Sequence, residues 1–185
     1  MNLGITGRKA IVCAASKGLG RACAFSLARE GVELTLISRT RETLEATASE
    51  IRAEHGAKVT IVTGDLATEA AREAVLEACP APDILITNPG SRQTPADFRT
   101  LTREDWLRWY DEHALSALGL IQHVAEGMSK RRFGRIVNIT VSFVKFPQIG
   151  FAHSHGARAA LSAASASIAR ELIAHNVTIN NVLPG

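Results

Sequence analysis

The sequence contains no apolar run long enough to span a bilayer and no apolar stretch at its start that would mark a signal peptide. These two absences predict a cytoplasmic protein with no membrane partner. Only three of the 185 residues are cysteine, at positions 13, 23 and 79. Because the number is odd and the spacing is not that of metal ligands, we expect free thiols and no metal site.

Aromatic residues are also few: six Phe, two Trp and a single Tyr. The net charge is +3, and the densest basic run is KRRFGR at 130–135. A nucleic-acid surface needs more positive charge on one face, together with aromatic platforms for the bases. We therefore expect no nucleic-acid partner and interpret the basic run as a solvated loop before a strand, although the charge suits a small anionic ligand.

Short apolar runs alternate with amphipathic stretches along the chain. Helices are predicted between Gly18 and Gly31, from Thr40, after a Thr68 cap, from Thr102 and over about 151–175. Thr102 and Asp105 fit a capping box with Asp in place of Glu or Gln. The apolar runs predict six buried strands, at 9–14, 33–38, 58–63, 83–87, 135–140 and 177–182.

This alternation predicts the α/β fold class: a doubly wound parallel sheet with helices on both faces, which is a three-layer Rossmann fold. Residues 1–185 are expected to form one domain. The sequence ends at VLPG directly after the sixth strand, so we expect it to lack the loop that covers a substrate and the last strand. The small, apolar helix at about 151–175 is expected to pack against the sheet and against a partner subunit, in a homodimer or homotetramer.

The turn after the first strand reads CAASKGLG at 13–20. Gly18 and Gly20 at the start of a helix would let backbone N–H groups approach a pyrophosphate. The pattern G-x-G-x-x-G is not met, because Cys23 stands at its third glycine. In the alternative interpretation, these glycines only allow a tight turn between strand and helix.

This turn resembles the T-G-x-x-x-G-x-G motif of the short-chain dehydrogenases/reductases, with Cys13 and Ala14 in place of Thr and the first Gly. Ala14 fits the turn if its φ is negative and strains it otherwise. TNPG at 87–90 resembles the family's N-N-A-G motif, and GRIVNIT and NNVLPG match its fifth and sixth strands. The resemblance covers the whole chain and extends to the 3-oxoacyl-[acyl-carrier-protein] reductases. It implies an enzyme that binds a dinucleotide and transfers hydride.

Ser38 and Arg39 follow the second strand, where NAD-preferring enzymes place an acidic residue. Together with Lys17, Arg39 suits a 2′-phosphate, so we expect NADP(H) as the cofactor. In the alternative interpretation, Arg39 and Arg41 are exposed charges in the first turn of a helix. The cofactor contacts implied by the resemblance are Ala14, Ser16, Lys17, Gly18, Leu19, Gly20, Ser38, Arg39, Asp65, Leu66, Asn88, Pro89, Gly90, Arg158, Pro184 and Gly185.

The family's catalytic set is Asn, Ser, Tyr and Lys, and none of the four stands at the corresponding position here. By spacing, His113 replaces Asn, Ser154 replaces Tyr and Arg158 replaces Lys, while Val141 takes the Ser position with Ser142 beside it. Some reductase-like members resemble this chain in a Ser-x-x-x-Arg pattern and in VK-x-P at 144–147. The single tyrosine, Tyr110, is no replacement by register.

Ser154 and Arg158 are four residues apart, which places them on one face of a helix. Arg158 can bind ribose hydroxyls and stabilise a developing alkoxide, but its high pKa prevents it from acting as the acid. Histidine suits that role, so His113 is the first candidate, acting through Ser154 and a water, followed by His155 and then His153. In the alternative interpretation these histidines cap a helix or face solvent, and the Ser142 hydroxyl bonds to backbone.

Three functions remain open on the sequence alone. The chain is an NADP(H)-dependent oxidoreductase that acts on a small carbonyl or alcohol, or a non-catalytic NADP(H) sensor or partner subunit, or a scaffold that has lost the cofactor. Cys13 and Ala14 favour the scaffold. The residues that argue against it are Gly18, Gly20, Arg39, Asn88 and Gly90. We favour the oxidoreductase; the sequence does not identify its substrate.

Overall fold

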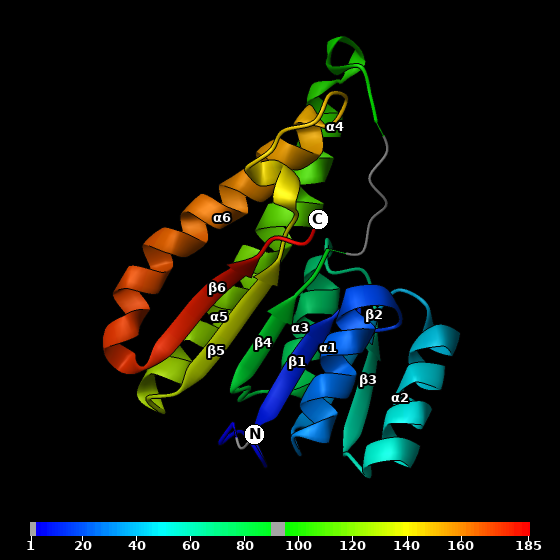
Figure 1. Ribbon diagram of the computed structural model, residues 1–185, viewed down its shortest axis with the longest axis vertical. Helices are drawn as coiled ribbons and strands as arrows, with labels where there is room; N and C mark the ends of the chain where they lie inside the picture. Colours follow the sequence, from blue (N-terminus) through cyan, green and yellow to red (C-terminus); the bar gives the residue numbers. More distant parts are fainter. Residues whose placement is uncertain (1–2, 90–94) are drawn as a thin grey trace.

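The computed structural model describes residues 3–89 and 95–185, and these form one parallel sheet with helices on both faces (Figure 1). The strand order is β3-β2-β1-β4-β5-β6. This order confirms the predicted doubly wound fold, and it places the point where the winding reverses between β1 and β4. The strands are β1 Lys9–Cys13, β2 Glu33–Ser38, β3 Val59–Thr63, β4 Ile84–Thr87, β5 Gly134–Ile139 and β6 Val177–Val182.

Two separate cores cover the faces of the sheet. On one face pack α1 (Gly18–Arg29) and α2 (Arg41–His55), and on the other pack α3 (Glu69–Ala78), α5 (Ser116–Lys130) and α6 (Ala152–Leu172). Neighbours along a strand serve different cores: Val12 faces the first and Ile11 the second, and both are fully buried. Burial on both faces explains why the strands appear in the sequence as continuous apolar runs.

The helix predicted from Thr102 is interrupted. Its first part, α4 (Arg103–Tyr110), begins with the predicted capping box, in which the Thr102 hydroxyl accepts from Asp105 N at 3.1 Å. A π-helical turn, Asp111–Leu115, separates α4 from α5. The cap on α3 is also confirmed, because Thr68 Oγ1 accepts from Ala71 N. Short 3₁₀ turns lie at Phe98–Thr100, Ser142–Val144 and Ile173–His175.

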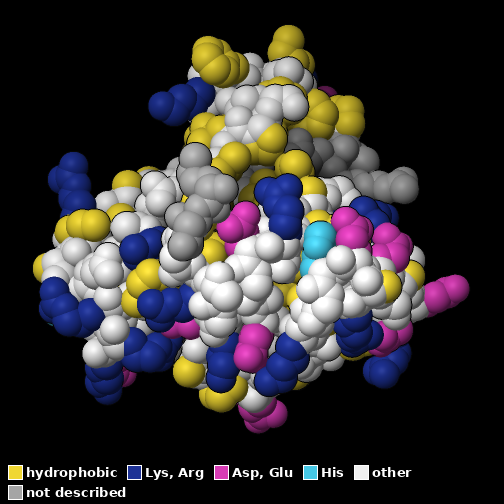
Figure 2. Space-filling model, turned by 60° about the horizontal axis from the view of Figure 1, so that its bottom comes forward, with side chains coloured by type: hydrophobic (Ala, Val, Ile, Leu, Met, Phe, Trp, Pro, Cys, Tyr) yellow, Lys and Arg dark blue, Asp and Glu magenta, His cyan; other side chains and the backbone are white. Residues whose placement is uncertain are grey.

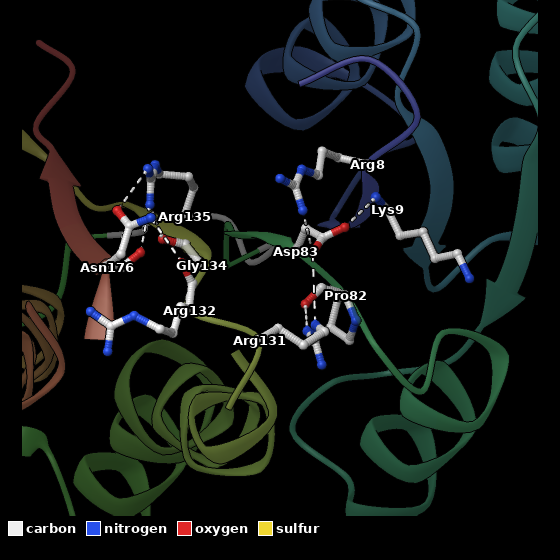
Figure 3. Close-up of polar contacts among 9 residues, drawn as sticks. All are labelled: Arg8, Lys9, Pro82, Asp83, Arg131, Arg132, Gly134, Arg135 and Asn176. Atoms are coloured by element: carbon white, nitrogen blue, oxygen red, sulfur yellow. Dashed lines mark hydrogen bonds and ion pairs between the residues drawn. The ribbon is translucent and has the colours of Figure 1, made fainter. Parts of the chain in front are cut away.

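The basic run 130–135 lies at the amino ends of the strands (Figure 3). Arg131 donates to the carbonyl of Pro82 at 2.6 Å, and Arg8 pairs with Asp83 at 3.4 Å. The guanidinium groups of Arg8 and Arg135 lie over the Phe133 ring, 3.8 and 4.4 Å from its centroid. The run is therefore an exposed turn before β5, as predicted, and its arginines also link neighbouring strands.

Lys and Arg side chains are scattered over the face shown in Figure 2, with Asp and Glu among them. Hydrophobic side chains gather at the top of this view. The exposed large hydrophobic residues of the chain include Phe98, Phe146 and Ile149. The outward side of α6 exposes Ala159, Ala163 and Ala166, and the expected partner subunit there stays a prediction. Among the described helices, none is long and apolar enough to cross a membrane.

Candidate functional site

A cavity of about 340 Å³ lies at the carboxyl ends of β1, β2 and β4, beside the point where the winding reverses. Open α/β sheets bind their ligands in this position, and the volume is in the range of small-molecule sites. The structure brings twelve of the sequence-predicted residues together in its lining: Ala14, Ser16, Lys17, Gly18, Leu19, Ser38, Arg39, Asp65, Leu66, Asn88, Pro89 and His113. Gly90 falls outside the described residues.

The turn between β1 and α1 forms one wall and depends on its glycines. Gly18 has φ +58°, and a Cβ on Gly20 would lie 2.4 Å from the carbonyl oxygen of Ala14. Gly20 itself does not line the cavity. Its missing side chain allows α1 to start directly against the turn. Ala14 has φ +48°, so the condition for an unstrained alanine at this position is not met. A left-handed conformation costs an L-residue roughly 1–2 kcal/mol.

The positive charges of the cavity come from Lys17 and Arg39, both on exposed residues at its rim. Lys17 is the residue before α1, and Arg39 lies between β2 and α2. Asp65 follows β3, beside the end of β2, where Gly64 N donates to the Ser38 carbonyl at 3.0 Å. One Asp65 carboxylate oxygen accepts from Ala67 N at 3.0 Å, which fixes the turn before α3. The N-terminus of α1 adds a partial positive charge, so this end of the cavity favours an anion.

Polar side chains brace the walls of the cavity. Thr47 in α2 donates to the carbonyl of Ser16 at 3.1 Å and holds the turn from behind. Thr87 at the end of β4 donates to Asn138 Oδ1 at 2.7 Å. Asn138 is fully buried and donates in turn to Ser165 at 2.9 Å and to Asn181 at 3.0 Å. These bonds link β4, β5, β6 and α6 behind Thr87, the one member of the network that lines the cavity.

His113 closes the other end of the cavity. It lies in the π-helical turn, is 1% exposed, and stacks on Trp109 with ring centroids 4.7 Å apart. The edge of His153 packs against the same Trp109 ring at 4.4 Å. Burial, together with the positive charge of Arg158, lowers the pKa of His113 to about 3. His113 is therefore neutral near pH 7, and an imidazolium acid is absent at this position.

Ser154 and Arg158 lie in the first two turns of α6, as predicted, and are 0% and 5% exposed. Neither lines the cavity, but Arg158 is close enough for its charge to lower the pKa of His113, which does. The Tyr110 hydroxyl lies 3.3 Å from the Cβ position of Gly156. Gly156 lies two residues from each of Ser154 and Arg158, and residues two apart on a helix do not share a face.

The histidines of α6 are neither caps nor solvent-facing, contrary to the alternative interpretation. His153 is 1% exposed beside Trp109, and His155 is 8% exposed between Phe143 and Phe151. Burial lowers the pKa of His155, and nearby positive charge adds to that effect. Both side chains pack as core residues.

Ser142 lies where the ends of β5 and β6 meet. Its backbone N–H donates to the carbonyl of Pro184 at 2.8 Å, and its hydroxyl lies 3.9 Å from the Cβ position of Gly185. Ser142, Pro184 and Gly185 are thus neighbours, but none of the three lines the cavity.

Several lining residues were not foreseen. Ser116, Ala117 and Leu120 follow His113 at helical spacing, so a helical projection from His113 could have found these three. Glu112, directly before His113, would not have been found in this way. Cys13 also lines the cavity, and burial raises the pKa of its thiol to about 12, which makes it an unreactive wall. The other unforeseen lining residues are Ile37, Thr40, Thr43, Gly64, Ala67 and Thr87. In the described ranges 3–89 and 95–185, no three His, Cys, Asp or Glu side chains cluster as metal ligands would.

Comparison with known proteins agrees with this geometry. The family model described as short chain dehydrogenase matches residues 8–185. The NADPH-dependent reductase BacG of Bacillus subtilis is 31% identical over 184 residues, which cover 96% of this chain and 70% of that protein. The 3-oxoacyl-[acyl-carrier-protein] reductase FabG of Vibrio cholerae is 29% identical over 99% of this chain and 75% of its own length. The structure of L-sorbose reductase from Gluconobacter frateurii, complexed with NADPH and L-sorbose, superposes with a TM-score of 0.95 at 27% identity, covering 100% of this chain and 72% of that one.

Proposed function

Because the chain belongs to the short chain dehydrogenase family, we propose that it is an NADP(H)-dependent oxidoreductase that interconverts a carbonyl and an alcohol. The observation that carries the proposal is the cavity, in which the glycine turn of α1 and the cations of Lys17 and Arg39 lie together. Its relatives include NADPH-dependent reductases, which supports the same cofactor here.

The residues present fit this cofactor. The missing side chain at Gly20 lets the α1 N-terminus come up to the turn, where its N–H groups would hold the pyrophosphate. Arg39 and Lys17 would hold the 2′-phosphate, because both are cationic and line the same end of the cavity. Asp65 and Leu66 would bound the adenine, and Asn88 and Pro89 the nicotinamide end. Arg158, Pro184 and Gly185 would contact that end from α6 and from beyond β6.

NADPH, when bound, supplies a hydride that together with one proton converts a carbonyl into an alcohol and leaves NADP⁺. The protein must then orient the carbonyl and stabilise charge on its oxygen. Arg158 would supply a fixed positive charge to that oxygen, while Ser142 and Ser154 would orient it by hydrogen bonds. His113, neutral near pH 7, would relay a proton as a hydrogen-bonded imidazole rather than release one as an imidazolium.

One observation favours a second candidate, a non-catalytic NADP(H) sensor or partner subunit. Ser154 is completely buried, and the low pKa of His113 leaves no titrating acid at the catalytic end. Both features are compatible with a protein that binds the cofactor without turnover.

The test begins with calorimetric titration of NADPH and NADH into the native protein and into Arg39→Ala, with Arg41→Ala as the matched control from the same exposed helix start. We expect Arg39→Ala to weaken NADPH binding roughly tenfold to a hundredfold, the worth of a charge-assisted hydrogen bond. NADH binding and the Arg41→Ala variant should be unaffected. Absence of binding by either cofactor would refute the proposal.

A carbonyl screen then separates the two candidates. Oxidation of NADPH by any ketone or aldehyde, lost in Arg158→Ala, supports the oxidoreductase. Tight NADPH binding without turnover on the whole panel supports the sensor instead.

A further inference from the structure

Near the end of the cavity that His113 closes lies a buried cation, Arg158, that no acid among the described residues compensates. The guanidinium group of Arg158 forms no ion pair and no side-chain hydrogen bond with any described residue, although the residue is 5% exposed. Within the described part of the chain its Nε has no hydrogen-bond partner, and burial lowers the pKa of the guanidinium group to about 10. A buried charge is strongly unfavourable unless an opposite charge or several hydrogen bonds compensate it.

A second polar group beside Arg158 is in the same condition. Ser154, one helical turn earlier on the same face, is 0% exposed, and its hydroxyl has no hydrogen-bond partner among the described residues. Buried hydroxyl groups are nearly always hydrogen-bonded in native proteins. Two adjacent donors that lack acceptors point to an acceptor brought by a ligand.

The surrounding side chains offer no substitute. Trp109, His113 and His153 pack at this end of the cavity, and none of them is an anion. Glu112 lines the cavity as well, but it forms no ion pair with Arg158 within the described structure. No anionic side chain of the described residues therefore pairs with Arg158.

We propose that the natural substrate is a carboxylate-bearing ketone, an oxo acid or its hydroxy acid, whose carboxylate pairs with Arg158 and accepts from Ser154. A planar carboxylate matches the guanidinium fork, and its single charge neutralises a single buried cation. A doubly charged phosphate would leave excess charge in the same enclosed place. This inference rests on the proposed function, since it names the substrate class of the same site.

The test uses the protein saturated with NADP⁺, in which a ketone binds without reacting. The probes are 2-oxobutanoate and 4-oxopentanoate, each compared with its methyl ester. Affinity is measured by calorimetry and by the fluorescence of the tryptophans, which lie only in α4, at Trp106 and Trp109. We expect at least one acid to bind roughly tenfold or more tightly than its ester, because a charge-assisted hydrogen bond is lost in the ester.

Arg158→Met should abolish the preference for the acid over its ester, and Arg158→Lys should restore part of that preference. Arg170→Met is the matched control, because it removes the same charge from an exposed position of the same helix. Without ligand, Arg158→Met should melt at a higher temperature than the native protein, since it removes an uncompensated buried charge. This readout also shows that the variant is folded.

The outcomes separate the two proposals. If NADP⁺ and NADPH do not bind, the proposed function fails and the substrate inference fails with it. If both bind and an ester or simple ketone is reduced, but neither acid binds better than its ester, only the substrate inference is overturned. An acid preference that survives in Arg158→Met would also overturn it.

Discussion

Gly20→Ala tests whether the turn before α1 requires the close approach of Gly20 to the backbone of Cys13 and Ala14. The new Cβ would lie 2.4 Å from the Ala14 carbonyl oxygen and 2.7 Å from that of Cys13. Ordinary contact begins at 3.4 Å, so the turn and the helix must separate by about 1 Å. Both obstructing atoms belong to the backbone and cannot rotate away. We expect a loss of about 2–3 kcal/mol in the free energy of unfolding, at the upper end of the usual overpacking cost.

Gly134→Ala is the control for overpacking away from the cavity. Gly134 lies in β5 at the amino end of the sheet, and its Cβ would lie 2.6 Å from Met128 Sδ and 2.8 Å from Val177 Cγ1. Both variants are compared by urea unfolding, and then by NADPH titration under conditions where each is folded. We expect both to lose stability, but only Gly20→Ala to lose NADPH affinity, by more than about tenfold. Equal NADPH affinity in Gly20→Ala and the native protein would show that the turn does not cradle the cofactor.

Two further predictions concern strain and pH. Ala14→Gly should relieve about 1–2 kcal/mol of left-handed strain against an unfolded-state cost of about 0.4–1 kcal/mol, so we expect a small rise in melting temperature; a fall would contradict the strain at φ +48°. His113 has its pKa lowered from 6.5 to about 3, so only the unfolded chain takes up its proton as the pH falls below 6.5. The contribution of His113 to the free energy of unfolding is therefore complete above pH 6.5. Below that pH the free energy of unfolding should decrease, by up to about 1.4 kcal/mol per pH unit from this group. Urea unfolding at about pH 7 and about pH 5 measures this loss of stability, which should be smaller in His113→Gln than in the native protein. An equal loss in both proteins would show that His113 is solvent-exposed and not buried.

The strands and most helix starts could be predicted because their signals are local. The strand expected at 33–38 is Glu33–Ser38, and Thr102 and Asp105 form the capping box that their spacing indicated. The strand expected at 9–14 ends at Cys13, because Ala14 turns into the left-handed region. The π-helical turn at Asp111–Leu115 could not be foreseen, since nothing in DEHAL distinguishes it from an α-helix.

The two ends of the candidate site differ in how far the sequence revealed them. The turn residues and Arg39 lie within a few positions of strand ends, so the rule that ligands bind at carboxyl ends located them. The burial of His113, His153 and Arg158 depends on how α4 docks against α6, which no local pattern encodes. The sequence therefore pointed to these residues but did not reveal their burial, and the alternative interpretation of the histidines as capping or solvent-facing was wrong.

The strand order also bears on how the chain assembles. Lys9 pairs with Glu33 and Leu34 with Val59, each about 25 residues apart, whereas Ala10 pairs with Ile84 across 74 residues. Closing the longer loop costs more chain entropy and slows pairing. We infer that β1, β2 and β3 associate early and that β4 joins β1 last. The cavity lies across the boundary between β1 and β4. Recovery of NADPH binding during refolding would therefore report when these two strands pair.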